Sequence, residues 1–282
     1  MSDQPQTMAA ALVRSVHPEK VFDYLPGMTP ANLAALYGLD EPGYRALRDR
    51  YAAQARQAAQ ALLAGQPLSA AAARLPFAAA ETVAVVGEST TDAADSWLEI
   101  LGHVLQQRPG GQVRLVNAAV SGYPTTMLQR VLAAVLIRHH PDWVIIFAGA
   151  NDILRYGADA TKPLVHAAET GRNLAEMHRA ARAAGARMIW MTPTGIDIGK
   201  ARNYPPFQHQ QIWLDPADAA AVDQAVRAQA TKEDLLVDLG DVLGQPPSPE
   251  LLDPDGVHPS PAGHAAIARA CIDQLAGQPR RR

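Results

Sequence analysis

The sequence Val-Ala-Val-Val-Gly-Glu-Ser-Thr-Thr at residues 83–91 passes from a short apolar run into small and polar residues. Such a run, rich in β-branched side chains and followed by a glycine, is typical of a buried strand that ends in a loop. Further β-like runs follow along the chain, at residues 113–116, 144–147, 188–191 and 235–237. Together these runs predict five strands, of which residues 83–86 form the first.

Helical patterns separate the predicted strands. They cover residues 97–106, 125–138, 165–184 and 216–230, and a last one covers residues 261–275. Strands that alternate with helices pair in parallel, because each crossover returns the chain to the same end of the sheet. The pattern therefore predicts an α/β fold, a three-layer α/β/α arrangement with a five-stranded, mainly parallel sheet. A functional site is expected at the carboxyl ends of the strands.

The first 80 residues differ from the rest in carrying helical patterns. Thr29 and Pro30 suit the N-cap and first turn of a helix over residues 31–37, and Gly38 suits its C-terminal cap. A second helix is predicted over residues 41–63, closed by Gly65, with an apolar stripe formed by Leu47, Tyr51, Ala55, Ala58 and Leu62. We therefore predict a helical extension at residues 1–80 and an α/β domain at residues 81–282. The stripe is expected to pack on that domain or on a second copy, in a homo-oligomer.

Composition indicates a compact globular protein. The 282 residues are 48% hydrophobic, which is enough to bury a large core. The formal net charge of -3 argues against a nucleic-acid surface, because phosphate binding is driven by excess Lys and Arg. The single cysteine, Cys271, excludes an intrachain disulfide and is expected to be a buried helical thiol. Because no signal peptide and no run of ~18 apolar residues is evident, a cytoplasmic location without membrane contact is expected.

A serine, a histidine and an aspartate stand at positions that suit nucleophilic catalysis. Ser89 directly follows the first predicted strand, and Asp255 precedes His258 by three residues. A serine hydroxyl becomes a good nucleophile only when an imidazole takes its proton and a third group orients that imidazole. Asp-x-x-His is a common spacing, and a solvated carboxylate beside a surface histidine is the alternative interpretation.

Two more apolar runs end in small or polar residues that can donate hydrogen bonds. The segment 115–122 ends in Ser121-Gly122, and the segment 143–152 ends in Asn151-Asp152. Attack on an acyl carbonyl creates an oxyanion, which preorganised donors stabilise. The N–H groups of Ser89 and Gly122 and the side-chain amide of Asn151 are candidate donors, each just beyond a strand end. Asp152 is expected to be a cap or a structural hydrogen-bonding residue.

These four segments, in this order, resemble the four sequence blocks of the SGNH (GDSL) hydrolase family, and they span roughly residues 81 to 276. The resemblance implies a flavodoxin-like fold, with Ser89 as nucleophile and Asp255 and His258 as its triad partners. It also implies an oxyanion hole formed by Ser89, Gly122 and Asn151. The first block usually reads Gly-Asp-Ser, so Glu88 is a variant of that pattern.

The resemblance implies a serine hydrolase that cleaves a carboxylic ester of a small molecule, such as a short acyl or acetyl ester of a sugar or metabolite. Two alternatives remain open. An acyltransferase would use the same acyl-enzyme with an alcohol in place of water, and a non-catalytic binding or scaffold protein would keep only the fold.

No cofactor is expected for this chemistry, and no metal is assigned, because His264 near His258 lacks a convincing third ligand. The longest predicted loop, residues 194–214, carries several aromatic side chains. Tyr204, Phe207 and Trp213 are therefore candidates for substrate binding. The alternative is that these aromatics only pack the loop onto the surface.

Overall fold

The computed structural model describes residues 3–108, 112–245 and 247–278. Within these residues a five-stranded sheet has the order β2-β1-β3-β5-β7, and every neighbouring pair is parallel. Its strands are β1 (Thr82–Gly87), β2 (Arg114–Asn117), β3 (Trp143–Phe147), β5 (Arg187–Met191) and β7 (Leu235–Val237). Each predicted strand is confirmed to within about one residue.

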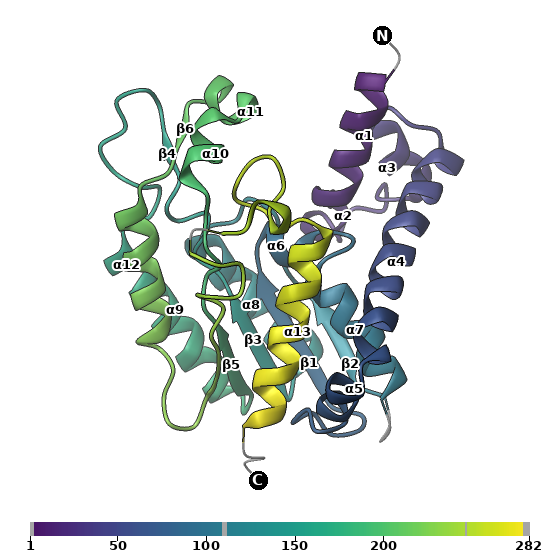
Figure 1. Cartoon of the computed structure of the whole chain (residues 1–282), viewed down its shortest axis with the longest axis vertical. Coiled ribbons are helices and arrows are strands. Elements are labelled where there is room, and N and C mark those ends of the chain that lie inside the picture. The colour runs from purple at the N-terminus through teal and green to yellow at the C-terminus, as the bar shows by residue number, and fades with distance from the viewer. Residues whose placement is uncertain (1–2, 109–111, 246, 279–282) are drawn as a thin grey trace.

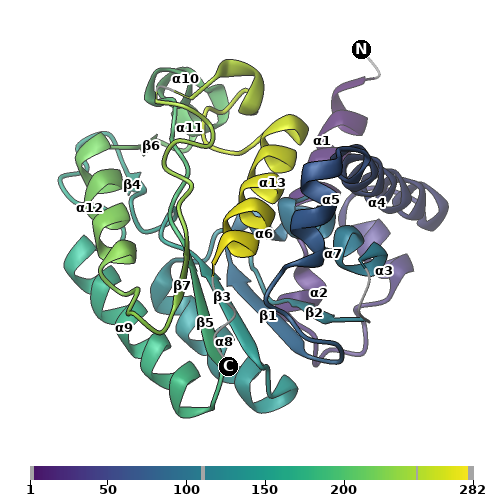
Figure 2. The same cartoon turned by 60° about the horizontal axis from the view of Figure 1, so that its bottom comes forward.

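Helices cover both faces of the sheet (Figures 1 and 2). One face packs on α8 (Thr125–His139), α9 (Ala167–Ala183) and α12 (Pro216–Arg227), and the other on α7 (Trp97–Gln107) and α13 (Pro261–Gly277). Residues of β3 alternate between the two cores: Ile145 faces α7 and α13, whereas Val144 and Ile146 face α8 and α9. This alternation follows from the two-residue repeat of a strand. The predicted three-layer α/β/α fold is confirmed.

The N-terminal residues form the helices α1 (Asp3–Ser15), α2 (Pro18–Val21), α3 (Pro30–Leu36), α4 (Glu41–Ala64) and α5 (Gln66–Ala73). The predicted cap is present, since the Thr29 hydroxyl accepts a hydrogen bond from the Asn32 N–H. The apolar side of α4 packs on α7, and α5 packs on α13. Ala55, Leu68 and Leu75 belong to the same hydrophobic core as strand β1. The α4 stripe is therefore covered within the chain, while the boundary at residue 80 and a homo-oligomer stay predictions.

The segment predicted as a long loop contains short elements. It holds α10 (Ile198–Asn203), α11 (Pro205–His209) and β6 (Ile212–Trp213), which pairs antiparallel with β4 (Arg155–Tyr156). Figure 1 shows α10 and α11 at the same end of the molecule as α1, above the sheet. None of the helices in the described ranges has the length and apolarity needed to span a bilayer.

Candidate active site

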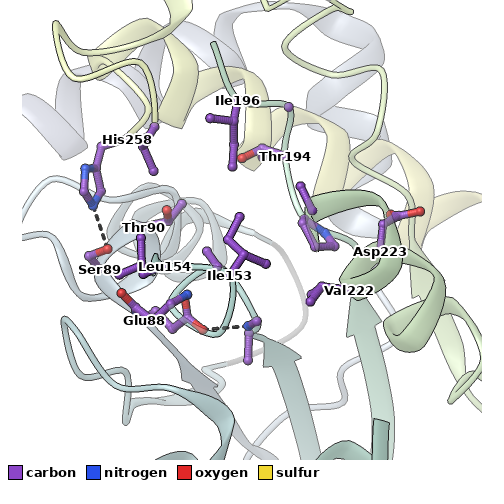
Figure 3. Close-up of a pocket in the computed structure, with 18 of the residues that line it drawn as sticks. Glu88, Ser89, Thr90, Ile153, Leu154, Thr194, Ile196, Val222, Asp223 and His258 are labelled. Carbon is purple, nitrogen blue, oxygen red and sulfur yellow. Dashed lines mark hydrogen bonds between the residues drawn. The ribbon is translucent and has the colours of Figure 1, made fainter. Parts of the chain in front are cut away.

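Ser89, His258 and Asp255 form a continuous hydrogen-bonded chain at the carboxyl end of the sheet. Ser89 begins the short helix α6 (Ser89–Asp92) just after β1, and its Oγ lies 2.7 Å from His258 Nε2 (Figure 3). His258 Nδ1 lies 2.6 Å from Asp255 Oδ2. Because an ionised carboxylate only accepts hydrogen bonds, Nδ1 carries a proton and Nε2 is free to accept the one from Ser89.

The Asp255 carboxylate is fixed by its own loop. Burial alone would raise the pKa of Asp255, but the hydrogen bond and charge of His258 and the N–H groups of Val257 and His258 lower it below its usual value. Gly256 makes the turn between the two side chains possible. Its φ is +72°, and a Cβ there would lie 2.6 Å from the carbonyl oxygen of Asp197. The sequence spacing thus corresponds to a tight turn that aims Asp255 at His258.

The three candidate oxyanion donors lie around one cavity. Ser89, Gly122 and Asn151 all line it together with His258. Gly122 has a φ of +80°, which a residue with a side chain rarely adopts, and it is exposed. Asn151 Nδ2 donates to the carbonyl oxygen of Tyr123 at 3.4 Å, a long bond that leaves the amide beside the cavity. The structure therefore brings together every residue that the four sequence blocks singled out.

Glu88 ties the first strand end to the third. Its side chain is buried, and its two carboxyl oxygens accept hydrogen bonds from the N–H groups of Gly149 at 2.6 Å and Asn151 at 3.1 Å. Burial raises the pKa of Glu88 to about 8, although these amide hydrogen bonds lower it. In the sequence Glu88 stands out only as a departure from aspartate, because its hydrogen-bond partners lie 61 and 63 residues further along the chain.

Asp152 has a structural role at the start of α8, as expected. Its Oδ1 accepts the Thr125 N–H at 2.7 Å, and its Oδ2 accepts the hydroxyls of Thr125 and Thr170, each at 2.6 Å. Burial raises the pKa of Asp152, and the threonine hydrogen bonds oppose that rise. This network joins α8 and α9 behind Asn151.

The cavity beside Ser89 has a volume of about 740 Å³ and is lined mainly by apolar side chains. Figure 3 shows Ile153, Leu154, Ile196 and Val222 around the space beyond Ser89. Sequence reasoning missed these residues, since nothing in a single apolar side chain marks it as facing a cavity rather than the core.

The three aromatic candidates for substrate binding have different positions. Phe207 lines the cavity. Tyr204 does not line the cavity. It precedes α11 and packs edge to face against Phe207, with 5.1 Å between the ring centroids. Trp213 does not line the cavity either, because it is paired into the β4–β6 ribbon and borders a much smaller cleft. Tyr204 and Trp213 therefore fit the alternative interpretation, in which the aromatic side chains only pack the loop onto the surface.

Among residues 3–108, 112–245 and 247–278, no group of three or more His, Cys, Asp or Glu side chains is arranged to hold a metal ion. His264 is buried in α13, and its Nδ1 accepts the Trp97 N–H at 3.3 Å. Burial lowers the pKa of His264 to about 3, so the ring is a neutral structural acceptor. Cys271, as expected, is a buried thiol in the same helix.

Comparison with known proteins places this geometry in a family. The GDSL-like lipase/acylhydrolase family matches residues 84–266. Esterase TesA of Pseudomonas aeruginosa is 32% identical over 195 residues, which cover 67% of this chain and 85% of that protein. A crystal structure of TesA superposes with a TM-score of 0.52 at 27% identity, covering 69% of this chain and 98% of that one.

A variant of Axe2, an acetylxylan esterase from Geobacillus stearothermophilus, superposes with a TM-score of 0.54 at 23% identity. The superposition covers 71% of this chain and 97% of that one, and it shows a shared fold. The family match over most of the chain and the related esterase show that this protein belongs to the GDSL-like lipase/acylhydrolase family of carboxylic ester hydrolases.

Proposed function

We propose that the protein hydrolyses a carboxylic ester through an acyl-enzyme on Ser89. The observation that carries the proposal is the pair of short contacts, 2.7 Å from Ser89 to His258 and 2.6 Å from His258 to Asp255. Such an arrangement lets the imidazole accept the serine proton while the carboxylate stabilises the imidazolium that forms.

In the first step Ser89 Oγ bonds to the carbonyl carbon, and its proton moves to His258 Nε2. The carbonyl oxygen becomes an oxyanion that the N–H groups of Ser89 and Gly122 and the Asn151 amide stabilise. The carbon–oxygen bond to the alcohol then breaks, and His258 returns the proton to the leaving oxygen. Water attacks the acyl-enzyme by the same route, giving the carboxylic acid and free Ser89.

The cavity favours a larger apolar group than the acetyl or short acyl group expected from the sequence. A volume of about 740 Å³ falls within the roughly 300–1,000 Å³ of pockets that bury drug-sized ligands. Ile153, Ile196 and Val222 offer apolar surface beyond the nucleophile (Figure 3). We infer that one side of the ester is an apolar chain that extends past Ser89 into this space.

The mechanism is tested by replacing the nucleophile. Ser89→Ala removes the covalent step, so we expect kcat to fall by several orders of magnitude and labelling by a fluorophosphonate to disappear. Ser69→Ala is the control, because it removes a serine hydroxyl from the exposed side of α5, outside the cavity, and should leave turnover and labelling unchanged. Near-native turnover by Ser89→Ala would rule out the acyl-enzyme.

The substrate is tested with p-nitrophenyl esters of graded acyl length and with acetylated sugars. Ala219 lines the cavity on α12, so Ala219→Phe should reduce kcat/KM for long acyl chains more than for acetyl. Ala217→Phe is the control on the same helix, since Ala217 is exposed and lies outside the cavity. An equal loss for all chain lengths would mean that the chain does not occupy this space.

A further inference from the structure

One buried carboxylate connects the N-terminal segment to the candidate oxyanion loop. Asp92 Oδ1 accepts hydrogen bonds from His17 Nδ1 at 2.9 Å and from Lys20 Nζ. Asp92 Oδ2 accepts both the N–H of Ser121 at 2.9 Å and its hydroxyl at 2.8 Å. Ser121 immediately precedes Gly122, whose N–H is the proposed oxyanion donor. The Asp92 carboxylate therefore links residues 17–20 to the segment 115–122, which ends in Ser121-Gly122.

The link is buried and charged, unlike an ordinary surface ion pair. His17 is 6% exposed and Asp92 is 2% exposed. Burial raises the pKa of Asp92, but the hydrogen bonds and charges of His17 and Lys20 outweigh burial and hold it at about 2. Lys20 Nζ also donates to the Ala119 carbonyl oxygen at 3.3 Å, in the same loop as Ser121. A buried carboxylate that lost its cation would have to rotate toward water or take up a proton.

Arg14, in the same N-terminal segment, contacts the loop that carries His258. Arg14 donates from Nε to Asp95 and from Nη1 to Asp253, each at 2.7 Å. The N–H of Asp253 in turn donates to the carbonyl oxygen of His258 at 2.8 Å. The two residues between these contacts, Ser15 and Val16, line the catalytic cavity. Figure 1 shows α1 and α2 at the end of the sheet where α6 begins.

We infer that residues 14–20 are part of the active site, and that His17 and Lys20 are positioning residues which act through Asp92 to hold the Gly122 N–H toward the oxyanion. The inference rests on the proposed function. These residues precede the part of the chain that matches the family, which begins at residue 84.

The base of the loop is tied to β1, because the N–H groups of Ala118 and Val120 donate to the carbonyl oxygens of Val85 at 2.9 Å and Gly87 at 3.0 Å. The part that Asp92 holds is the tip, at Ser121 and Gly122. Gly122 is exposed, and an added Cβ would meet no atom within 4 Å. Its neighbour Ser121 gives both of its donors to the same Asp92 oxygen. A donor stabilises an oxyanion only when it is already in place as the charge develops. Loosening Asp92 should therefore weaken transition-state stabilisation more than substrate binding.

The test is Lys20→Met, with Lys20→Arg as the conservative variant and Arg45→Met as the matched control. Arg45 belongs to the same N-terminal region but pairs with Glu41 on the exposed side of α4. For Lys20→Met we expect kcat on a p-nitrophenyl ester to fall about tenfold with KM little changed. This is a partial loss, because removal of one whole oxyanion donor typically lowers kcat by a factor of ~10²–10³. Lys20→Arg should restore most of the rate, and Arg45→Met should leave it unchanged.

Amide hydrogen exchange gives a second readout that does not depend on turnover. In Lys20→Met, exchange should become faster at residues 119–123 and stay unchanged over β3 and α9. Unchanged exchange at Ser121 would overturn the coupling, whether or not the wild-type protein hydrolyses the ester. Faster exchange with an unchanged kcat would overturn the positioning role. A wild-type protein with no esterase activity would instead refute the proposed function, and the exchange data would still decide the link.

Discussion

Asn151 is proposed to stabilise charge that appears during the reaction. Its side-chain amide lies beside the cavity, and its hydrogen bond to the Tyr123 carbonyl oxygen is long, at 3.4 Å. Asn151→Ala should therefore lower kcat by roughly 10²–10³ with a smaller effect on KM. Steady-state kinetics on a p-nitrophenyl ester would check this. A change confined to KM would mean that Asn151 binds the ground-state substrate.

Glu88 should make stability depend on pH. Burial raises the pKa of Glu88 to about 8 in the folded protein, whereas a glutamate in an unfolded chain titrates near about 4.3. Between these values the folded state holds more protons than the unfolded state. The free energy of unfolding contributed by Glu88 therefore falls as the pH rises through this window and falls no further above it.

Glu88→Gln removes this titration. The difference in free energy of unfolding between the wild type and the variant therefore reports the contribution of Glu88 alone, because other titrating groups such as His264 contribute equally to both proteins. Urea unfolding from pH 5 to 8.5 should show the wild-type protein losing stability relative to the variant as the pH rises. Glu233→Gln, at a surface ion pair with Arg182, should keep the wild-type slope. Parallel curves for wild type and Glu88→Gln would contradict the raised pKa.

Single residues also show what the sequence could and could not reveal about the site. Ser89, Gly122, Asn151 and His258 were recognisable because each follows a strand or sits in a motif of short spacing. The hydrogen bonds of Asp92 were not recognisable, since they join residues up to 75 positions apart. A contact of that kind is set by packing, which a local pattern does not encode.

At the scale of elements, the strands were predictable because each is a short apolar run bounded by turn residues. Helices α4, α7, α8, α9, α12 and α13 were predicted by their amphipathic spacing. The helices α1 and α5 were not predicted. Each has a proline close to its start, Pro5 in α1 and Pro67 in α5, which indicates a turn as readily as a first helical turn, and α5 has only 8 residues. The short α10 and α11 were hidden in a segment whose prolines and glycines indicate a loop.

The contact between α4 and α7 should be intolerant of added volume. Ala59 is fully buried in the core that α4 shares with α7, so a larger side chain would have to displace its neighbours. Ala59→Leu should therefore lower the free energy of unfolding by about 1–3 kcal/mol. Urea denaturation would measure the loss. Gln60→Leu, which places the same side chain on the exposed side of α4, should change stability little, and equal effects would contradict this packing.

At the scale of the whole molecule, the N-terminal helices combine two functions that the sequence did not separate. Helices α4 and α5 complete the core beside α7 and α13, whereas Ser15 and Val16 border the cavity. The sequence indicated an extension with an apolar stripe that must be covered. The sequence of that extension contains no catalytic motif, so it does not predict the contribution of Ser15 and Val16 to the cavity wall. A chain shortened in two steps should separate these functions.

A chain that starts at Pro26 lacks α1 and α2 but keeps α4 and α5, so it should fold and have a reduced kcat. A chain that starts at Ala78 also loses Leu68, Leu75 and Phe77, all buried in the main core. Burial of each such side chain contributes roughly 1.5–3 kcal/mol to the free energy of unfolding. The summed contribution of all three is comparable with the typical total of about 5–15 kcal/mol. This shorter chain should expose α7 and α13 and aggregate.

Light scattering and thermal unfolding would compare the two shortened chains. If the chain from Ala78 were monomeric and unfolded cooperatively near the wild-type temperature, α4 and α5 would be an appendage and not part of the core.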